Sequence, residues 1–119
     1  MERIKKVNEL MRREISTIIQ QEFQDPKLMF VTIVRVDVSR DLRHAAVYYS
    51  FLGEDKKLKE IVQTFERLSR YIRKLVGQRI RLRYTPELRF IFDKSIEYGA
   101  RIEKAFEDIH EQTPEVPPS

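Results

Sequence analysis

The chain has 119 residues, a length typical of a single domain, and carries 23 Lys and Arg against 19 Asp and Glu. It has no cysteine and only two isolated histidines, His44 and His110, so we expect no disulfide, no thiol chemistry, no metal and no cofactor. No apolar run approaches the ~20 residues of a membrane span, and the first residues lack the apolar part of a secretion signal, which predicts a cytoplasmic protein without membrane contact.

An amphipathic helix is predicted at the start of the chain. Its apolar residues recur at three- and four-residue steps: Ile4, Val7, Met11, Ile15 and Ile18. This pattern runs to about Phe23. Asp25-Pro26 then ends the helix, because proline disfavours the helical conformation in the residue before it.

A β-hairpin is predicted next. Residues 30–38 are rich in β-branched types and favour a strand, residues 39–42 favour a turn, and residues 44–52 form a second strand. One face of that second strand is apolar and consists of Ala45, Val47, Tyr49 and Phe51.

Residues 58–76 show a long helical pattern, which predicts one bent helix or two helices nearly in register, ending near Gly77–Leu82. Alternation over residues 88–92 indicates a third strand. Asp93 or Ser95 can cap a last helix, whose buried residues would be Ile96, Ile102, Phe106 and Ile109.

The predicted fold class is therefore α+β, a three-stranded sheet with helices on one face. We expect one domain over residues 1–110. Residues 111–119 are proline-rich and acidic, and they are predicted to be a disordered tail.

Several segments together resemble the bacterial ribosome-binding factor A family. They are Asp25-Pro26-Lys27-Leu28, Val31-Thr32-Ile33, residues 36–42, residues 81–90 and Asp93-Lys94-Ser95-Ile96-Glu97. The likeness covers about residues 3–106. It implies a type II KH-like fold of order α-β-β-α-kink-α-β. It also implies a maturation factor that binds the free 30S subunit and 16S rRNA, assists late processing of pre-16S rRNA, and is needed most in the cold.

The sequence departs from the family at the kink. The resemblance implies small residues in an Ala-x-Gly pattern there, whereas this chain has Leu68-Ser69-Arg70. Arg70 thus places a cation where the family usually leaves bare backbone.

Positive charge is concentrated in one segment. Residues 107–119 carry a net charge of −4, which leaves +8 on the first 106 residues. Between residues 67 and 83 there is no acid, and there are seven cations: Arg67, Arg70, Arg73, Lys74, Arg79, Arg81 and Arg83. On one straight helix, Arg67, Arg70, Lys74 and Arg81 would share a face within about 60° and form a row ~21 Å long. Such a row suits an RNA backbone better than a solvated face with unpaired charge.

The predicted RNA-binding residues also include cations outside this segment. The complete set is Arg67, Ser69, Arg70, Arg73, Lys74, Arg81, Arg83, Lys5, Lys6, Arg12, Arg13 and Arg40. For the first helix, pairing with Glu9 in a salt-bridged face is an equal alternative. For Arg40, a structural turn held by Asp41 is the stronger interpretation.

The function predicted from these patterns is a monomeric, non-enzymatic assembly factor of the 30S subunit. Asp37, Asp41, Glu87 and Asp93 offer acids for a Mg²⁺-dependent nuclease, but no motif gathers them, so no catalytic residue is assigned. Two alternatives remain open. One is a generic KH-like RNA- or DNA-binding module, and the other is a protein-interaction domain that uses Val7, Met11 and Ile18.

Overall fold

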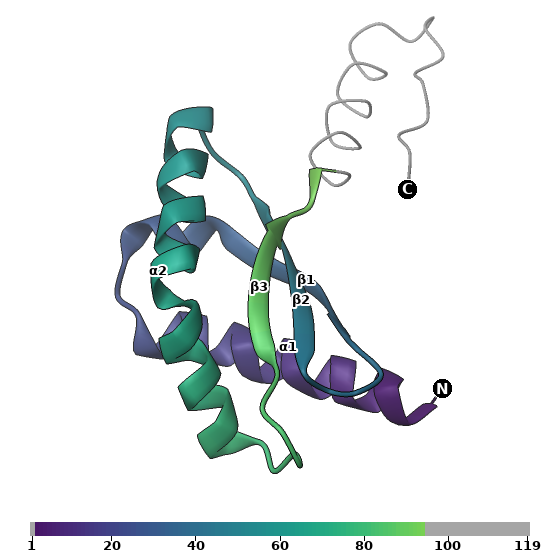
Figure 1. Cartoon of the computed structure of the whole chain (residues 1–119). Coiled ribbons are helices and arrows are strands. Elements are labelled where there is room, and N and C mark those ends of the chain that lie inside the picture. The colour runs from purple at the N-terminus through teal and green to yellow at the C-terminus, as the bar shows by residue number, and fades with distance from the viewer. Residues whose placement is uncertain (1, 95–119) are drawn as a thin grey trace, which may run out of the picture.

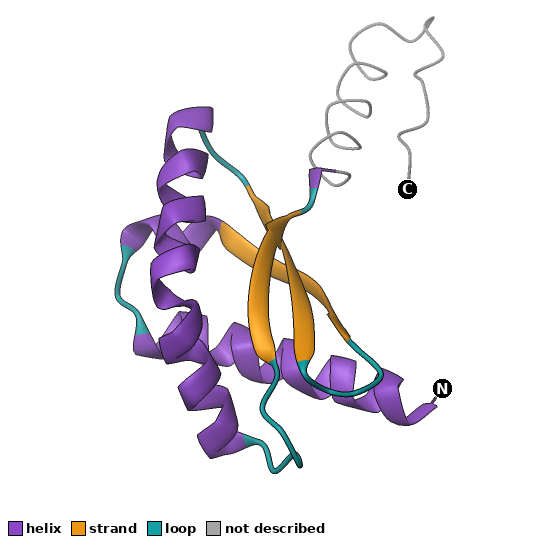
Figure 2. Cartoon of the chain, in the orientation of Figure 1, coloured by secondary structure: helices purple, strands orange, loops and turns teal. Residues whose placement is uncertain are grey.

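A computed structural model gives the fold of the chain and describes residues 2–94. The elements in chain order are the helix α1 (Glu2–Glu22), the 3-10 helix η1 (Pro26–Phe30), the strands β1 (Val31–Val38) and β2 (His44–Phe51), the helix α2 (Asp55–Arg79) and the strand β3 (Glu87–Phe92). Figure 1 shows both long helices on the same side of the sheet, and Figure 2 separates the helical layer from the strand layer. This arrangement confirms the predicted α+β class.

The sheet has the order β1-β2-β3, with β1 and β2 antiparallel and β2 and β3 parallel. Helix α1 packs on β1, α2 packs on β3, and the two helices touch each other. The core lies between these two layers. Its largest fully buried side chains include Tyr49, Phe65, Met11, Ile15, Ile18, Ile61 and Ile72.

The hairpin follows the predicted pattern with one irregularity. Ala45, Val47, Tyr49 and Phe51 are all buried on the core face of β2. In β1 the register shifts at Val34, so that Ile33 pairs with Tyr49 and Arg35 pairs with Tyr48. This β-bulge lets Ile33 and Val36, three residues apart, both point into the core.

The turn between β1 and β2 is held by side chains. The carboxylate of Asp41 accepts hydrogen bonds from the Ser39 hydroxyl (2.7 Å) and the Arg43 N–H (3.1 Å), and the Ser39 hydroxyl accepts one from the His44 N–H (3.0 Å). The first two bonds lower the pKa of Asp41, the Ser39 bond contributing most. These contacts confirm that Asp41 holds the turn.

Helix α2 is a single helix that passes through Leu68-Ser69-Arg70 without interruption, so the chain does not have two separate helices there. Its ribbon changes direction near the middle (Figure 1). The Ser69 hydroxyl donates to the Glu66 carbonyl at 3.3 Å, a contact of a kind that often accompanies helix bending. The helix ends at Arg79, because Ile80 is already extended (φ −118°, ψ 129°).

Two sequence predictions lie outside the described residues. They are the last helix, with Ile96, Ile102, Phe106 and Ile109, and the tail over residues 111–119.

Candidate nucleic-acid interface

An open groove with a volume of about 570 Å³ lies between the second half of α2 and the loop that follows it. We call it the basic groove. It is lined by Arg70, Arg73, Lys74, Gly77, Arg83, Tyr84 and Thr85. Its four cationic side chains belong to exposed residues, and no described residue of the lining is acidic. The groove therefore presents an uncompensated positive charge to solvent.

Local geometry brings the loop against the helix. The Arg73 guanidinium donates two hydrogen bonds to the Thr85 carbonyl, at 3.1 and 2.8 Å. Gly77 permits the close approach, since a Cβ at this position would lie 2.9 Å from the Thr85 hydroxyl oxygen. As a result Arg83, nine residues after Lys74, lines the same groove.

The predicted straight row of cations is wrong at one end. Because α2 ends at Arg79, Arg81 lies in the loop and does not continue the helical face of Arg67, Arg70 and Lys74. Arg67 and Arg81 are exposed but do not line the basic groove. The loop after α2 brings Arg83, and not Arg81, beside Arg70 and Lys74. A calculation for a straight helix cannot predict this, because it contains no contacts between the loop and the helix.

Arg79 has a structural contact that the sequence pattern did not reveal. Its guanidinium lies 2.7 Å from a carboxylate oxygen of Glu22 and 3.9 Å from one of Glu14, both on α1. The segment between residues 67 and 83 has no acid of its own, so these partners come from a helix more than fifty residues away in sequence. Arg79 therefore joins the two helices.

The four predicted RNA-binding cations of α1 fall into two groups, the pair Arg12 and Arg13 and the pair Lys5 and Lys6. Glu9 pairs with Arg12, which donates to it at 3.0 Å, and with Arg13 at 3.4 Å. The hydrogen bond from Arg12 is the main cause of a lowered pKa of Glu9, although burial opposes it. Lys5 and Lys6 are exposed. For Arg12 and Arg13, the salt-bridged alternative is thus the one that the contacts support.

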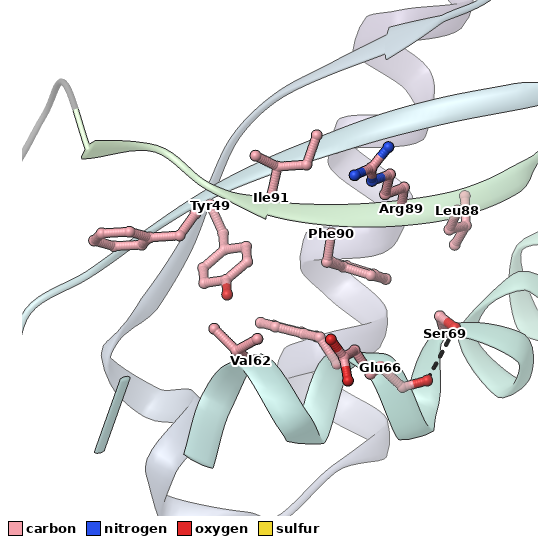
Figure 3. A pocket seen from close by; sticks show the side chains of 10 residues that line it. Tyr49, Val62, Glu66, Ser69, Leu88, Arg89, Phe90 and Ile91 are labelled. Carbon is pink, nitrogen blue, oxygen red and sulfur yellow. Dashed lines mark hydrogen bonds between the residues drawn. The ribbon is translucent and has the colours of Figure 1, made fainter. Parts of the chain in front are cut away.

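Next to the basic groove, a cavity of about 500 Å³ lies between α2 and β3 (Figure 3). Its walls include Tyr49, Val62, Phe65, Ser69 and Phe90. The rings of Phe65 and Phe90 are stacked, with centroids 4.5 Å apart. A third, smaller cavity, lined by Ser69, Arg70, Arg73, Glu87 and Leu88, shares lining residues with both the apolar cavity and the basic groove. Sequence patterns identified Phe65 and Phe90 as core residues but did not reveal the opening beside them.

Comparison with known proteins places the chain in a family. A sequence model of ribosome-binding factor A matches residues 3–106. The chain belongs to the ribosome-binding factor A family. The ribosome-binding factor A of Halothermothrix orenii is 42% identical over 111 residues, which are 93% of this chain and 91% of that protein.

Solved structures of the same family share the fold. The crystal structure of ribosome-binding factor A from Thermus thermophilus matches with a TM-score of 0.67 and 24% identity, over 74% of this chain and 93% of that one. A homology model of the Thermus thermophilus factor, fitted into a cryo-EM map of its complex with the 30S subunit, matches with a TM-score of 0.60 and 25% identity. That match covers 71% of this chain and 89% of the other.

Three of the four acids considered for Mg²⁺ binding make contacts within the fold. Asp37 pairs with Arg35 at 3.2 Å, Asp93 lies 3.8 Å from the same guanidinium, and Asp41 holds the turn. Across residues 2–94, no group of three His, Asp or Glu is placed to hold a metal ion. Within the same residues, no helix is long and apolar enough to cross a membrane.

Proposed function

We propose that this chain binds the RNA of the immature 30S subunit through the basic groove, and that it does so without catalysing a reaction. The single observation that carries the proposal is the groove itself, in which Arg70, Arg73, Lys74 and Arg83 converge without an acid in the described lining. Membership of the ribosome-binding factor A family supports the ribosomal partner. So does the 30S complex of the Thermus thermophilus relative.

The groove suits phosphate more than base recognition. Three of its four cations are arginines, whose planar guanidinium groups can bind phosphate oxygens through two parallel hydrogen bonds. Such contacts fix the position of an RNA backbone and carry little sequence information by themselves. Recognition then depends on the spacing of phosphates in folded 16S rRNA.

In this mechanism the protein acts by population shift. It binds one local fold of the rRNA more tightly than the competing folds, so that fold becomes the major one until late processing of pre-16S rRNA is complete. Competing RNA folds are more persistent at low temperature, which would make the protein most important in the cold. We further propose that it acts as a cytoplasmic monomer and leaves the subunit before translation.

A charge-reversal experiment tests the binding surface. Arg70→Glu with Lys74→Glu should abolish co-sedimentation with free 30S subunits while the circular dichroism spectrum stays unchanged. The matched control is Lys56→Glu with Lys59→Glu, an equal charge change on exposed residues at the other end of α2. Binding that survives the first pair, or is lost equally with the control pair, contradicts the assigned site.

The salt dependence of RNA binding tests the phosphate contacts. With four to seven contacts, log affinity should fall against log salt with a slope of about −3 to −6. The Arg70→Ala, Lys74→Ala variant, which removes two contacts without reversing the charge, should have a slope shallower by about 2. A salt-independent affinity of the unmodified chain would contradict the proposal.

Two further assays test the proposed function against a generic KH-like binding module and against a nuclease. A generic KH-like binding module would associate equally with free 30S subunits, whole ribosomes and unrelated RNA, whereas the proposed factor is enriched on free 30S subunits. A nuclease would cleave pre-16S rRNA in Mg²⁺ and would lose that activity in Asp37→Ala and Asp93→Ala, whereas we expect no cleavage by the unmodified chain.

A further inference from the structure

A second cavity, of about 360 Å³, shares Arg83 and Tyr84 with the basic groove. Three segments distant in sequence form it. They are the start of α1, the turn between β1 and β2, and the loop after α2, which Figure 1 shows at the same end of the molecule. We call it the Tyr84 cavity. Its volume is at the lower end of the ~300–1,000 Å³ range of small-ligand sites.

The lining of the Tyr84 cavity combines three kinds of side chain. Ile4, Val7 and Leu42 are half-buried and supply apolar surface. Cations from each of the three segments, Arg3, Arg40 and Arg83, supply positive charge from exposed residues. Tyr84 as a residue is 41% exposed.

Arginines also hold the Tyr84 ring. The guanidinium of Arg43 lies 4.8 Å from the ring centroid, and that of Arg83 lies 5.5 Å from it. These distances are within the range of cation–π attraction, which orients the ring before any ligand arrives. Tyr84 nevertheless keeps 41% of its surface exposed. Unpaired RNA bases stack on exposed aromatic rings and on guanidinium planes, so the ring and its arginines together offer a stacking surface.

Charge in the cavity favours an anion. The described lining contains one acid, Asp41, and its carboxylate already accepts hydrogen bonds from Ser39 and Arg43 within the turn. Leu42, the next residue, has a positive φ of 61°, which is costly for a leucine. The turn thus keeps a strained conformation while it supplies both Leu42 and Arg40 to the cavity.

We propose that the Tyr84 cavity binds one unpaired RNA nucleotide, with its base stacked on Tyr84 and its neighbouring phosphates on Arg40 and Arg83. This inference rests on the proposed RNA-binding function. Arg83 and Tyr84 line both the basic groove and the Tyr84 cavity. One RNA strand can therefore contact phosphate-binding arginines in the groove and place its next base in the cavity.

The test compares single-stranded and duplex RNA of the same length by fluorescence anisotropy. Tyr84→Leu should weaken binding of the single strand by roughly 5- to 150-fold, the effect expected from loss of one base–aromatic stack. Tyr84→Phe should bind within about twofold of the unmodified chain, because phenylalanine retains the π-face. Tyr71→Leu, which removes a tyrosine of similar exposure (46%) on α2, is the matched control and should have no such effect.

The readouts distinguish failure of this inference from failure of the proposed function. If the unmodified chain shows no salt-dependent RNA binding, the proposed function fails. If the unmodified chain binds RNA but Tyr84→Leu binds the single strand equally well, this inference is overturned. The Tyr84 cavity would then bind a different ligand, such as an acidic peptide. An equal loss on single strand and duplex would also overturn it, because a paired base cannot enter the cavity.

Discussion

The guanidinium of Arg79 lies 2.7 Å from the Glu22 carboxylate, which ties the last turn of α2 to the last turn of α1. Arg79 has a second carboxylate partner, Glu14, at 3.9 Å. Of the seven cations between residues 67 and 83, this one has its charge compensated within the fold. It should therefore act on stability and not on RNA binding.

Replacement of Arg79 with alanine tests that separation. Arg79→Ala should lower the free energy of unfolding by ~1 kcal/mol, the upper range for partly exposed ion pairs. RNA affinity at a temperature well below unfolding should stay within about twofold. Urea denaturation and anisotropy give the two values. An affinity loss as large as that of Arg70→Ala would show that Arg79 contacts RNA.

Arg73 is predicted to act on both stability and binding, because it lines the basic groove and also holds the loop through the Thr85 carbonyl. Arg73→Lys keeps the charge but loses the two-bond geometry, since lysine has no planar fork. We expect a loss of ~1 kcal/mol in stability and faster amide hydrogen exchange in the loop over residues 80–86. Arg70→Lys is the control and should leave loop exchange unchanged. Unchanged exchange in Arg73→Lys would mean that these hydrogen bonds do not hold the loop.

Gly77 offers a test of the contact between α2 and the loop. Alanine in a helix interior is favoured over glycine by ~1 kcal/mol, but a Cβ at Gly77 would lie 2.9 Å from the Thr85 hydroxyl oxygen. In the unmodified background, Gly77→Ala should therefore fail to stabilise the protein. In a Thr85→Ala background that oxygen is absent, and Gly77→Ala should raise the free energy of unfolding by up to ~1 kcal/mol. Equal effects in the two backgrounds, measured by urea denaturation as a double-mutant cycle, would contradict the contact.

Periodic patterns predicted the elements well where burial alone decides them. Met11, Ile15 and Ile18 recur at helical spacing and are all fully buried, and the alternating face of β2 is buried as predicted. Hydrophobic periodicity carries this information because each element buries one face against the same core. The bulge at Val34 interrupts the alternation of β1, and no periodic pattern predicts an inserted residue.

The candidate site was predicted only in part, because its geometry depends on contacts between distant segments. The charge pattern placed Arg70 and Lys74 on one helical face and named Arg73 among the RNA-binding residues, and the basic groove contains all three. It could not show that α2 ends at Arg79, which removes Arg81 from the helical row. Nor could it show the meeting of Arg3, Arg40 and Arg83 around Tyr84, since these residues come from three separate parts of the chain.

The buried hydroxyl of Tyr49 should make the stability of the fold depend on pH in the alkaline range. Its ring is buried between Phe65 and Phe92, with centroids at 4.7 and 5.9 Å. Burial raises the pKa of the Tyr49 hydroxyl to about 12, and the charge of Glu66 adds to the effect. The unfolded chain loses this proton near pH 10, so between pH 10 and 12 the folded state binds more protons than the unfolded state. Stability from this group is therefore fully present below pH 10 and falls as pH rises through 12.

Tyr49→Phe should remove this part of the alkaline loss of stability. Phenylalanine retains the ring contacts and has no proton to lose, so the variant should become more stable relative to the unmodified chain as pH rises from 10 to 12. Urea denaturation at successive pH values measures the difference. Tyr71→Phe removes an exposed tyrosine and should leave the alkaline loss as it is. If the curves of Tyr49→Phe and the unmodified chain remain parallel over this interval, the Tyr49 hydroxyl is not the group whose ionisation destabilises the fold.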